Sequence, residues 1–306
     1  MGATQLQHKH MRRLIPAMLA MALCGLQPAQ AAPDSQVYES AYNYIITDSY
    51  GPVVAFRRME NGATLSAIDL SRPNYQVIPY TSYLFAPLFI HPNPQKVLSI
   101  GLGAGAFNRL FNSAYPAASL TTAEIDPMIL DVAVRRTGFK AGPNNVVAIQ
   151  DGRRYLKTSK TKWDWIVIDA YVRRSHIPAH LTTVEFFRLV KEHLTENGVM
   201  AVNVVSRDQL LLSMTKTIGA AFASNVAFAV PNSGNIVILA TNQTDPHLAE
   251  KFDTLRDQSL IGLMKENNVD LLSFKYSLAQ LKVPDRIEVL TDDFAPVEYL
   301  DGVNKN

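Results

Sequence analysis

The chain has 306 residues, of which 47% are hydrophobic and 18% are charged. These values are typical of a folded globular protein and exclude a disordered or fibrous chain. Its 29 basic and 27 acidic residues give a formal net charge of +2, which argues against a broadly basic surface for nucleic acid. We therefore expect a globular protein with ample core and no nucleic-acid partner.

The N-terminal 31 residues have the form of a signal peptide. Lys9, Arg12 and Arg13 precede the apolar run 14–26, and small residues at 29 and 31 form a cleavage site. The apolar run is too short to span a bilayer comfortably. We expect export to the periplasm, cleavage after Ala31 and no membrane association afterwards.

Cleavage would change the charge balance and remove the single cysteine, Cys24. The leader holds three basic and no acidic residues, so the mature chain would carry 26 basic against 27 acidic residues. A chain without cysteine forms no disulfide and has no thiol catalysis or cysteine metal site. The seven histidines are scattered, without the spacing of a metal site. We expect no bound metal.

Residues 32–92 predict a small antiparallel β subdomain followed by a linking helix. Apolar residues alternate with smaller or polar ones from Tyr38 to Ile46, and apolar segments follow at 53–56 and 64–68. Turn sequences rich in Gly, Asp and Asn separate these segments. We expect three or four strands up to about residue 80, then a helix over 80–89.

The stretch 97–126 predicts a nucleoside-binding βαβ unit: an apolar strand at 97–100, a helix from about 106 and a second strand that ends at Glu124. The turn between the first strand and the helix contains Gly101, Gly103 and Gly105. Glycine lets the backbone turn sharply, so a ligand can approach the turn and the helix N-terminus. Glu124 is placed to accept hydrogen bonds from a ribose diol. Nicotinamide enzymes, S-adenosyl enzymes and ligand-free turns all share this pattern.

Strands and helices alternate beyond Glu124. We expect helices at 127–136, 183–194 and 210–222, a short helix after Asp151-Gly152, and strands at 146–149, 165–168, 199–204, 226–230 and 236–240. Repeated units of this kind predict a parallel sheet that is covered on both faces. The last two strands are joined by a turn too short for a crossover, so the final strand runs antiparallel. This ending favours an α/β, methyltransferase-type Rossmann domain over 93–306 and disfavours a nicotinamide-binding fold.

Two further carboxylates follow predicted strands. Asp151 comes just after 146–149, and Asp169 ends the apolar strand 165–168, next to Tyr171. Ligands bind at this edge of such sheets, so both side chains are candidate site residues. Either aspartate could instead only cap a helix or a loop.

With these motifs, the chain resembles the spermidine synthase (polyamine aminopropyltransferase) family from about residue 38 to residue 206. Four segments carry the resemblance: IGLGAG at 100–105, AEIDP at 123–127, QDGRRYL at 150–156 and WDWIVIDAY at 163–171. The β subdomain ahead of the sheet is also typical of that family. The closing LTDDFAPVE resembles the C-terminal signature of a broader group of spermidine-synthase-like proteins.

The resemblance implies transfer of an aminopropyl group from decarboxylated S-adenosylmethionine, a co-substrate, to a small amine acceptor. It implies that Glu124 holds the ribose, that Asp151 binds the adenine amino group and that Gly152 lets the chain pass close to the ring. Asp169, with Tyr80 and Tyr171, would hold and deprotonate the acceptor, because a carboxylate can orient an ammonium and take its proton. Family members are often oligomers, so a homodimer is possible.

Two departures from the family pattern bear on the acceptor. The family's Tyr-His-Glu run reads Tyr80-Thr81-Ser82 here, and the loop after Asp169 reads AYVRRSHIP, where the family has a second aspartate and a proline. Unless its arginines point to solvent, this loop disfavours a polyamine cation and favours an anionic acceptor. Two alternatives stay open: an S-adenosylmethionine-dependent methyltransferase, and a non-catalytic periplasmic binding protein on a retired enzyme fold.

Overall fold

The computed structural model describes residues 34–58, 62–172, 177–205, 208–245, 247–253 and 255–300. The predicted signal peptide and the loop residues Arg173, Arg174 and His176 lie outside these ranges. Residues Pro33–Asn306 form one compact unit. No helix in the described ranges is long and apolar enough to cross a membrane. The boundary between an N-terminal subdomain, residues 32–92, and a Rossmann-like domain, residues 93–306, stays a prediction.

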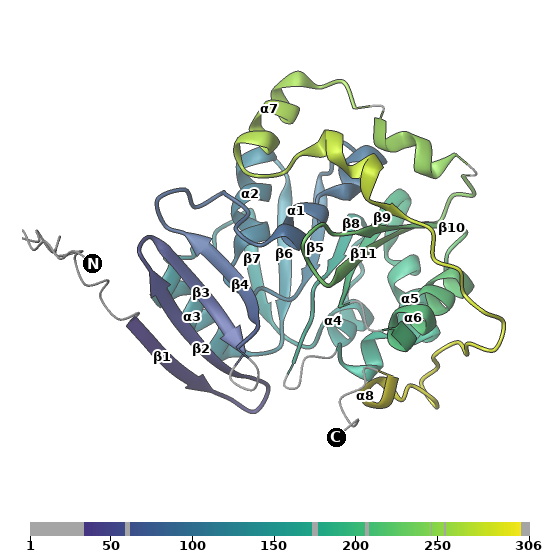
Figure 1. Cartoon of the computed structure of the whole chain (residues 1–306), viewed down its shortest axis with the longest axis horizontal. Helices are drawn as coiled ribbons and strands as arrows, with labels where there is room; N and C mark the ends of the chain where they lie inside the picture. Colours follow the sequence, from purple (N-terminus) through teal and green to yellow (C-terminus); the bar gives the residue numbers. More distant parts are fainter. Residues whose placement is uncertain are drawn as a thin grey trace, which may run out of the picture. The chain divides into compact units, whose positions relative to one another are not determined.

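The unit begins with a four-stranded antiparallel sheet in the order β1-β2-β3-β4. Its strands are β1 (Asp34–Glu39), β2 (Tyr44–Tyr50), β3 (Val53–Arg58) and β4 (Thr64–Asp69). This confirms the predicted β subdomain. Helix α3 (Pro127–Thr137) lies beside this sheet (Figure 1). Ile45, Phe56 and Ile68 on one face of the sheet pack against Ile129 and Val132 of α3. Burial of these apolar side chains holds the small sheet against the main domain.

The single helix expected over 80–89 is instead two short pieces, α1 (Pro79–Tyr83) and the 3₁₀ helix η1 (Ala86–Phe89). Pro87 explains the break. Proline has no N–H for the helical bond, and its ring clashes with the carbonyl of the preceding turn. The α-helix therefore ends ahead of it, and Tyr80 and Tyr83 remain buried in the first piece.

The main sheet has eight strands in the order β12-β10-β11-β9-β8-β5-β6-β7. These are β5 (Lys96–Ile100), β6 (Ser119–Glu124), β7 (Asn145–Ile149), β8 (Trp163–Ile168), β9 (Leu194–Val205), β10 (Ser224–Ala229), β11 (Asn235–Thr241) and β12 (Leu278–Ala279). Strands β5 to β9 pair in parallel, and β11 lies antiparallel between β9 and β10. The methyltransferase-type Rossmann fold is thus confirmed. The two-residue strand β12 at the edge was not predicted.

Strand β9 differs from its prediction in one respect. The sequence predicts this strand at 199–204, after Asn197-Gly198, a pair typical of turns. In the structure the strand already begins at Leu194 and contains an irregularity. Trp163 pairs with Leu194, whereas Trp165 pairs with Val199, so β9 carries extra residues at this point. A bulge of this kind accommodates a turn sequence without ending the strand.

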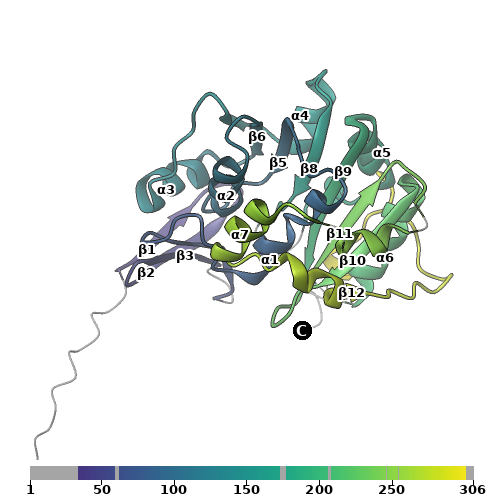
Figure 2. The same cartoon turned by 90° about the horizontal axis from the view of Figure 1, so that it is seen from above.

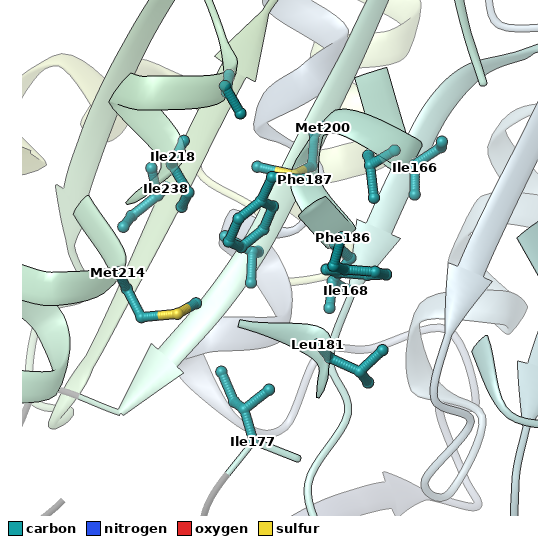
Figure 3. Close-up of a cluster of buried hydrophobic side chains, with 14 of the residues drawn as sticks. Ile166, Ile168, Ile177, Leu181, Phe186, Phe187, Met200, Met214, Ile218 and Ile238 are labelled. Atoms are coloured by element: carbon teal, nitrogen blue, oxygen red, sulfur yellow. The ribbon is translucent and has the colours of Figure 1, made fainter. Parts of the chain in front are cut away.

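Helices cover both faces of the main sheet (Figure 2). Besides α1 and α3 they are α2 (Ala106–Ala114), α4 (Gly152–Thr158), η3 (Ala179–Leu181), α5 (Val184–Glu192), α6 (Asp208–Ala221), η4 (Leu248–Asp253), α7 (Gln258–Glu266), η5 (Leu271–Ser277) and α8 (Val297–Leu300). On the face of α5 and α6, Phe186, Phe187 and Met214 pack on Ile168 and Met200 of the sheet (Figure 3). Full burial of one such side chain contributes about 1.5–3 kcal/mol. This packing fixes the strands whose ends carry the site.

The C-terminal LTDDFAPVE segment docks on α4 and α5. The Arg153 guanidinium donates to both carboxylate oxygens of Asp292, at 2.7 and 2.6 Å, and Thr183 Oγ1 donates to one of them. The hydrogen bond from Arg153 outweighs the opposing effect of burial and lowers the pKa of Asp292 to about 2. The motif noted in the sequence therefore holds the C-terminal segment against the helix that follows Asp151.

Candidate active site

A pocket opens at the carboxyl ends of β5, β6 and β8, where parallel sheets of this type bind ligands. It has a volume of about 820 Å³, counted out to its open mouth. Strands of the N-terminal sheet complete its wall with Ile45, Phe56 and Leu65. The expected site residues that line it are Tyr80, Gly101, Gly103, Glu124, Asp151, Gly152, Asp169 and Tyr171. Gly105, the ninth, is not among the lining residues.

The glycine turn is shaped by contacts with the protein itself. Gly101 has a φ of 102°, and a Cβ there would lie 2.2 Å from the carbonyl oxygen of Asp169. A Cβ on Gly103 would lie 2.9 Å from Ser66 Oγ, and Gly105, the N-cap of α2, packs against Phe139. The glycines therefore let β4 and the end of β8 approach the turn closely.

We expect Gly101→Ala to destabilise the protein by about 3 kcal/mol or more, because a backbone carbonyl blocks the methyl group and φ is positive. Thermal unfolding measures the loss. Gly262→Ala is the matched control: this glycine is exposed on α7 and has open space around it. Alanine there should be neutral or stabilising. Equal melting temperatures for both variants would contradict the close approach of the turn to Asp169.

Glu124 ends β6 and is only 7% exposed. Its Oε2 accepts a hydrogen bond from the Leu102 amide at 2.9 Å, and its Oε1 accepts one from the Asp126 amide at 2.9 Å. Burial raises the pKa of Glu124 to about 7, although these amides favour the charged form. The carboxylate is thus fixed beside the glycine turn, and each oxygen keeps a second lone pair for a ligand hydroxyl.

Asp151 both caps α4 and lines the pocket. Its Oδ1 accepts from the Arg154 amide at 2.8 Å, and its Oδ2 lies 2.6 Å from His180 Nε2. Burial opposes the charged form, but the His180 and Arg154 hydrogen bonds hold the pKa of Asp151 below its usual range. A Cβ on Gly152 would lie 2.3 Å from Ile100 Cγ2, so glycine is required where α4 begins against β5. The capping role is real, and it leaves Asp151 exposed to the pocket.

Asp169 is half-buried at the end of β8 and is held by two neutral donors. Tyr80 Oη donates to its Oδ2 at 3.0 Å, and Asn203 Nδ2 donates to its Oδ1 at 2.9 Å. Burial raises the pKa of Asp169, and these two hydrogen bonds offset the shift only in part. Among the described residues this carboxylate has no cationic partner. Together with its raised pKa, this suits a general base.

Tyr80 lies between two acceptors. Its hydroxyl is 2.8 Å from the Leu65 carbonyl oxygen and 3.0 Å from Asp169 Oδ2, yet it has one hydrogen to donate. Burial, followed by the charge of Asp169, raises the pKa of Tyr80 well above its ordinary value. The single hydroxyl hydrogen of Tyr80 therefore serves either the Leu65 carbonyl oxygen or the Asp169 carboxylate, and the charge of the carboxylate favours the second.

The Tyr171 hydroxyl is engaged with the backbone of β9. It donates to the Asn203 carbonyl and accepts from the Val205 amide, both at 2.9 Å. Tyr171 lines the pocket, but its hydroxyl group makes both of these hydrogen bonds to the backbone of β9. Tyr171 therefore holds the loop after β8 to the end of β9.

Sequence reasoning missed two residues that hold the site carboxylates, Asn203 and His180. Asn203 is 2% exposed and is the one asparagine inside the apolar run 199–205, a signal that the sequence did offer. His180 follows the loop 172–178, and no local pattern connects it to Asp151. Only the fold brings these two together.

The pocket wall is acidic. Within the described ranges it contains the carboxylates of Glu124, Asp151 and Asp169 and no lysine, arginine or histidine side chain. No group of three or more potential metal-ligating side chains occurs among those residues. The charge of the wall favours a cationic ligand over an anionic one.

Comparisons with a family model, with related sequences and with solved structures all point to the same family. Residues 79–250 match the family model for the spermine/spermidine synthase domain. A polyamine aminopropyltransferase of Vibrio vulnificus is 29% identical over 228 residues, covering 72% of this chain and 75% of that protein. The structure of spermidine synthase from Thermotoga maritima has a TM-score of 0.57 at 19% identity and covers 88% of this chain and 87% of its own. A spermidine synthase in complex with the transition-state analogue AdoDATO gives the same TM-score and identity, with 88% of each chain covered.

Proposed function

The chain belongs to the spermine/spermidine synthase family, and from this premise we propose that it transfers an aminopropyl group from decarboxylated S-adenosylmethionine to an amine. The observation that carries the proposal is the acidic pocket, in which Glu124 and Asp169 stand at the ends of β6 and β8, the strands on either side of β5. A sulfonium donor and an ammonium acceptor are both cations, and such a wall attracts them. Several relatives carry the name polyamine aminopropyltransferase, which supports a transferase.

In the proposed reaction the acceptor nitrogen attacks the methylene carbon next to the sulfonium. The new C–N bond forms as the C–S bond breaks, and the electron pair of that bond leaves with methylthioadenosine. Before the attack, Asp169 takes a proton from the acceptor ammonium, which frees the lone pair of the nitrogen, and its carboxylate orients the resulting amine. Glu124 would hold the ribose hydroxyls, and Asp151, kept ionised by its hydrogen bonds, would bind the adenine amino group.

The donor tail separates this proposal from a methyltransferase. Intact S-adenosylmethionine carries a carboxylate, which needs a cation or a set of donors to bind it. The described part of the pocket wall offers no basic side chain, and the carboxylate of Asp169 would repel that group. This supports the decarboxylated donor and disfavours methyl transfer.

Calorimetric titration of residues 32–306 tests the proposal. We expect decarboxylated S-adenosylmethionine and methylthioadenosine to bind at least tenfold more tightly than S-adenosylmethionine, with no binding of NAD. A preference for the intact donor would instead identify a methyltransferase. No binding of any of the four would support the non-catalytic alternative and overturn the proposal.

We further propose that the protein acts after export, since residues 1–31 have the form of a signal peptide. Fractionation of cells that produce the full chain, with N-terminal sequencing of the product, tests this. A mature N-terminus at Ala32 in the periplasmic fraction is the expected result. A homodimer also stays a prediction, which light scattering would check.

A further inference from the structure

A chain of side-chain hydrogen bonds runs from the turn between β10 and β11 to Asp169. Ser233 Oγ donates to Asn235 Oδ1 at 2.5 Å, and Asn235 Nδ2 donates to Asn203 Oδ1 at 2.8 Å. Asn203 Nδ2 then donates to Asp169 Oδ1 at 2.9 Å. Every link therefore points its hydrogen toward the carboxylate.

The ionised Asp169 carboxylate, which can only accept, requires this direction at its end of the chain, and the backbone at the far end is compatible with it. The Asn235 amide can only donate, and it donates to Ser233 Oγ at 3.2 Å. In this arrangement the Ser233 hydroxyl donates its own hydrogen to Asn235 Oδ1, and Asn235 Nδ2 faces Asn203. The oxygen of Asn203 must face that donor, so its nitrogen faces Asp169.

Orientation matters because the two ends of an asparagine amide have nearly the same shape and opposite polarity. A reversed Asn203 would place its oxygen against the Asp169 carboxylate and repel the charged form. Strand register keeps the two amides adjacent: Val237 lies opposite Asn203, and Asn235 lies opposite Val205, so the asparagines are diagonal neighbours on one face. Asn203 is buried, so water does not compete for its place.

We propose that Asn203, oriented by Asn235 and Ser233, is a positioning residue. Its hydrogen bond favours the ionised form of Asp169 and thereby controls how easily the Asp169 carboxylate accepts a proton. The role of Asp169 as the base rests on the proposed function. The chain through the asparagines does not, because its effect on the carboxylate exists in the folded protein without substrate. Asn203 also accepts the Tyr171 hydroxyl through its carbonyl, so the end of β9 supports both residues that follow β8.

The test compares Asn203→Ala, Asn235→Ala and Ser233→Ala with Asn225→Ala, an exposed asparagine of β10 outside the chain. A hydrogen bond to a charged group contributes about 1.5–3 kcal/mol. Asn203→Ala should therefore move the acid limb of the plot of kcat/KM against pH to higher pH, by about one to two pH units. The shift should be smaller for Asn235→Ala, smallest for Ser233→Ala and zero for Asn225→Ala.

Thermal unfolding tests the same inference without any substrate. The loss of melting temperature caused by Asn203→Ala should grow as the pH rises from 5 to 8, because the missing hydrogen-bond donor matters only when Asp169 is ionised. A growth of about 2–4 °C is expected for a chain of this size. In an Asp169→Asn background the penalty should be the same at both pH values.

A penalty that does not change with pH in the wild-type background would overturn the inference, whether or not transfer activity is found. Failure of aminopropyl transfer together with a pH-dependent penalty would overturn the proposed function alone. If Asn203→Ala does not fold, Asn235→Ala decides the matter, since that residue is only half-buried. Asn235 does not contact Asp169, so a shift of the acid limb to higher pH in Asn235→Ala supports the chain of hydrogen bonds. An unshifted acid limb overturns the inference.

Discussion

Asp169→Asn should lower kcat for aminopropyl transfer by about 10²–10⁴-fold, the range typical of a lost general base. Asparagine keeps the size of the side chain and its hydrogen bonding to Tyr80, but it cannot take a proton from the amine. Donor affinity should change little, because the ribose and adenine contacts proposed above belong to Glu124 and Asp151. Stopped assays of methylthioadenosine formation measure the rate, and calorimetry with methylthioadenosine measures the binding.

The pH profile gives the same prediction a second check. Burial raises the pKa of Asp169, so kcat/KM should rise with pH on a limb that lies above the ordinary range of an aspartate. Tyr80→Phe removes a donor to the charged form, so this limb should move to higher pH. Asp131→Asn, a change on the exposed surface of α3, is the control and should leave the profile in place. Turnover by Asp169→Asn within threefold of wild type would refute the assignment of the base.

Glu124→Gln should weaken the binding of methylthioadenosine by about 100-fold, since two hydrogen bonds from a ribose diol to a charged acceptor would be lost or weakened. Glutamine has one oxygen where two amides, those of Leu102 and Asp126, need acceptors. Circular dichroism must therefore show that the variant is folded. A 2′,3′-dideoxy analogue should bind weakly to wild type and equally weakly to the variant. If the variant lost affinity for both ligands alike, Glu124 would not contact the diol.

Glu124 also predicts a pH dependence of binding and of stability. With its pKa at about 7, wild-type affinity for methylthioadenosine should fall about tenfold per pH unit below 7, as the acceptor becomes protonated. Asp151 does not contribute in this range, because its pKa lies below the usual one. The pKa of Glu124 is raised from 4.5, so its contribution to stability is full below pH 4.5 and is lost as the pH rises through 7. Glu124→Gln should flatten both dependences, and calorimetry with thermal scans from pH 5 to 8 measures them.

Local sequence pattern was enough to predict the fold class, the succession of strands and helices along the chain and the three carboxylates of the pocket wall. Periodicity placed the strands, and the short turn between β10 and β11 required an antiparallel pair. Because Glu124, Asp151 and Asp169 each follow a parallel strand, their meeting at one edge of the sheet was predictable from local pattern. Motif spacing is local information, and this part of the site depends on local information alone.

The surroundings of each of these carboxylates come from contacts between distant parts of the chain. Gly101 is a glycine because the carbonyl of Asp169, far along the chain, lies against it. Asn203 and His180 reach their carboxylates through strand pairing and helix packing, with no fixed distance in sequence. The raised pKa values of Glu124 and Asp169 come from burial, a property of the assembled core. The sequence could thus name the acids, whereas their hydrogen-bond partners and proton affinities depend on contacts between distant residues, which no local pattern contains.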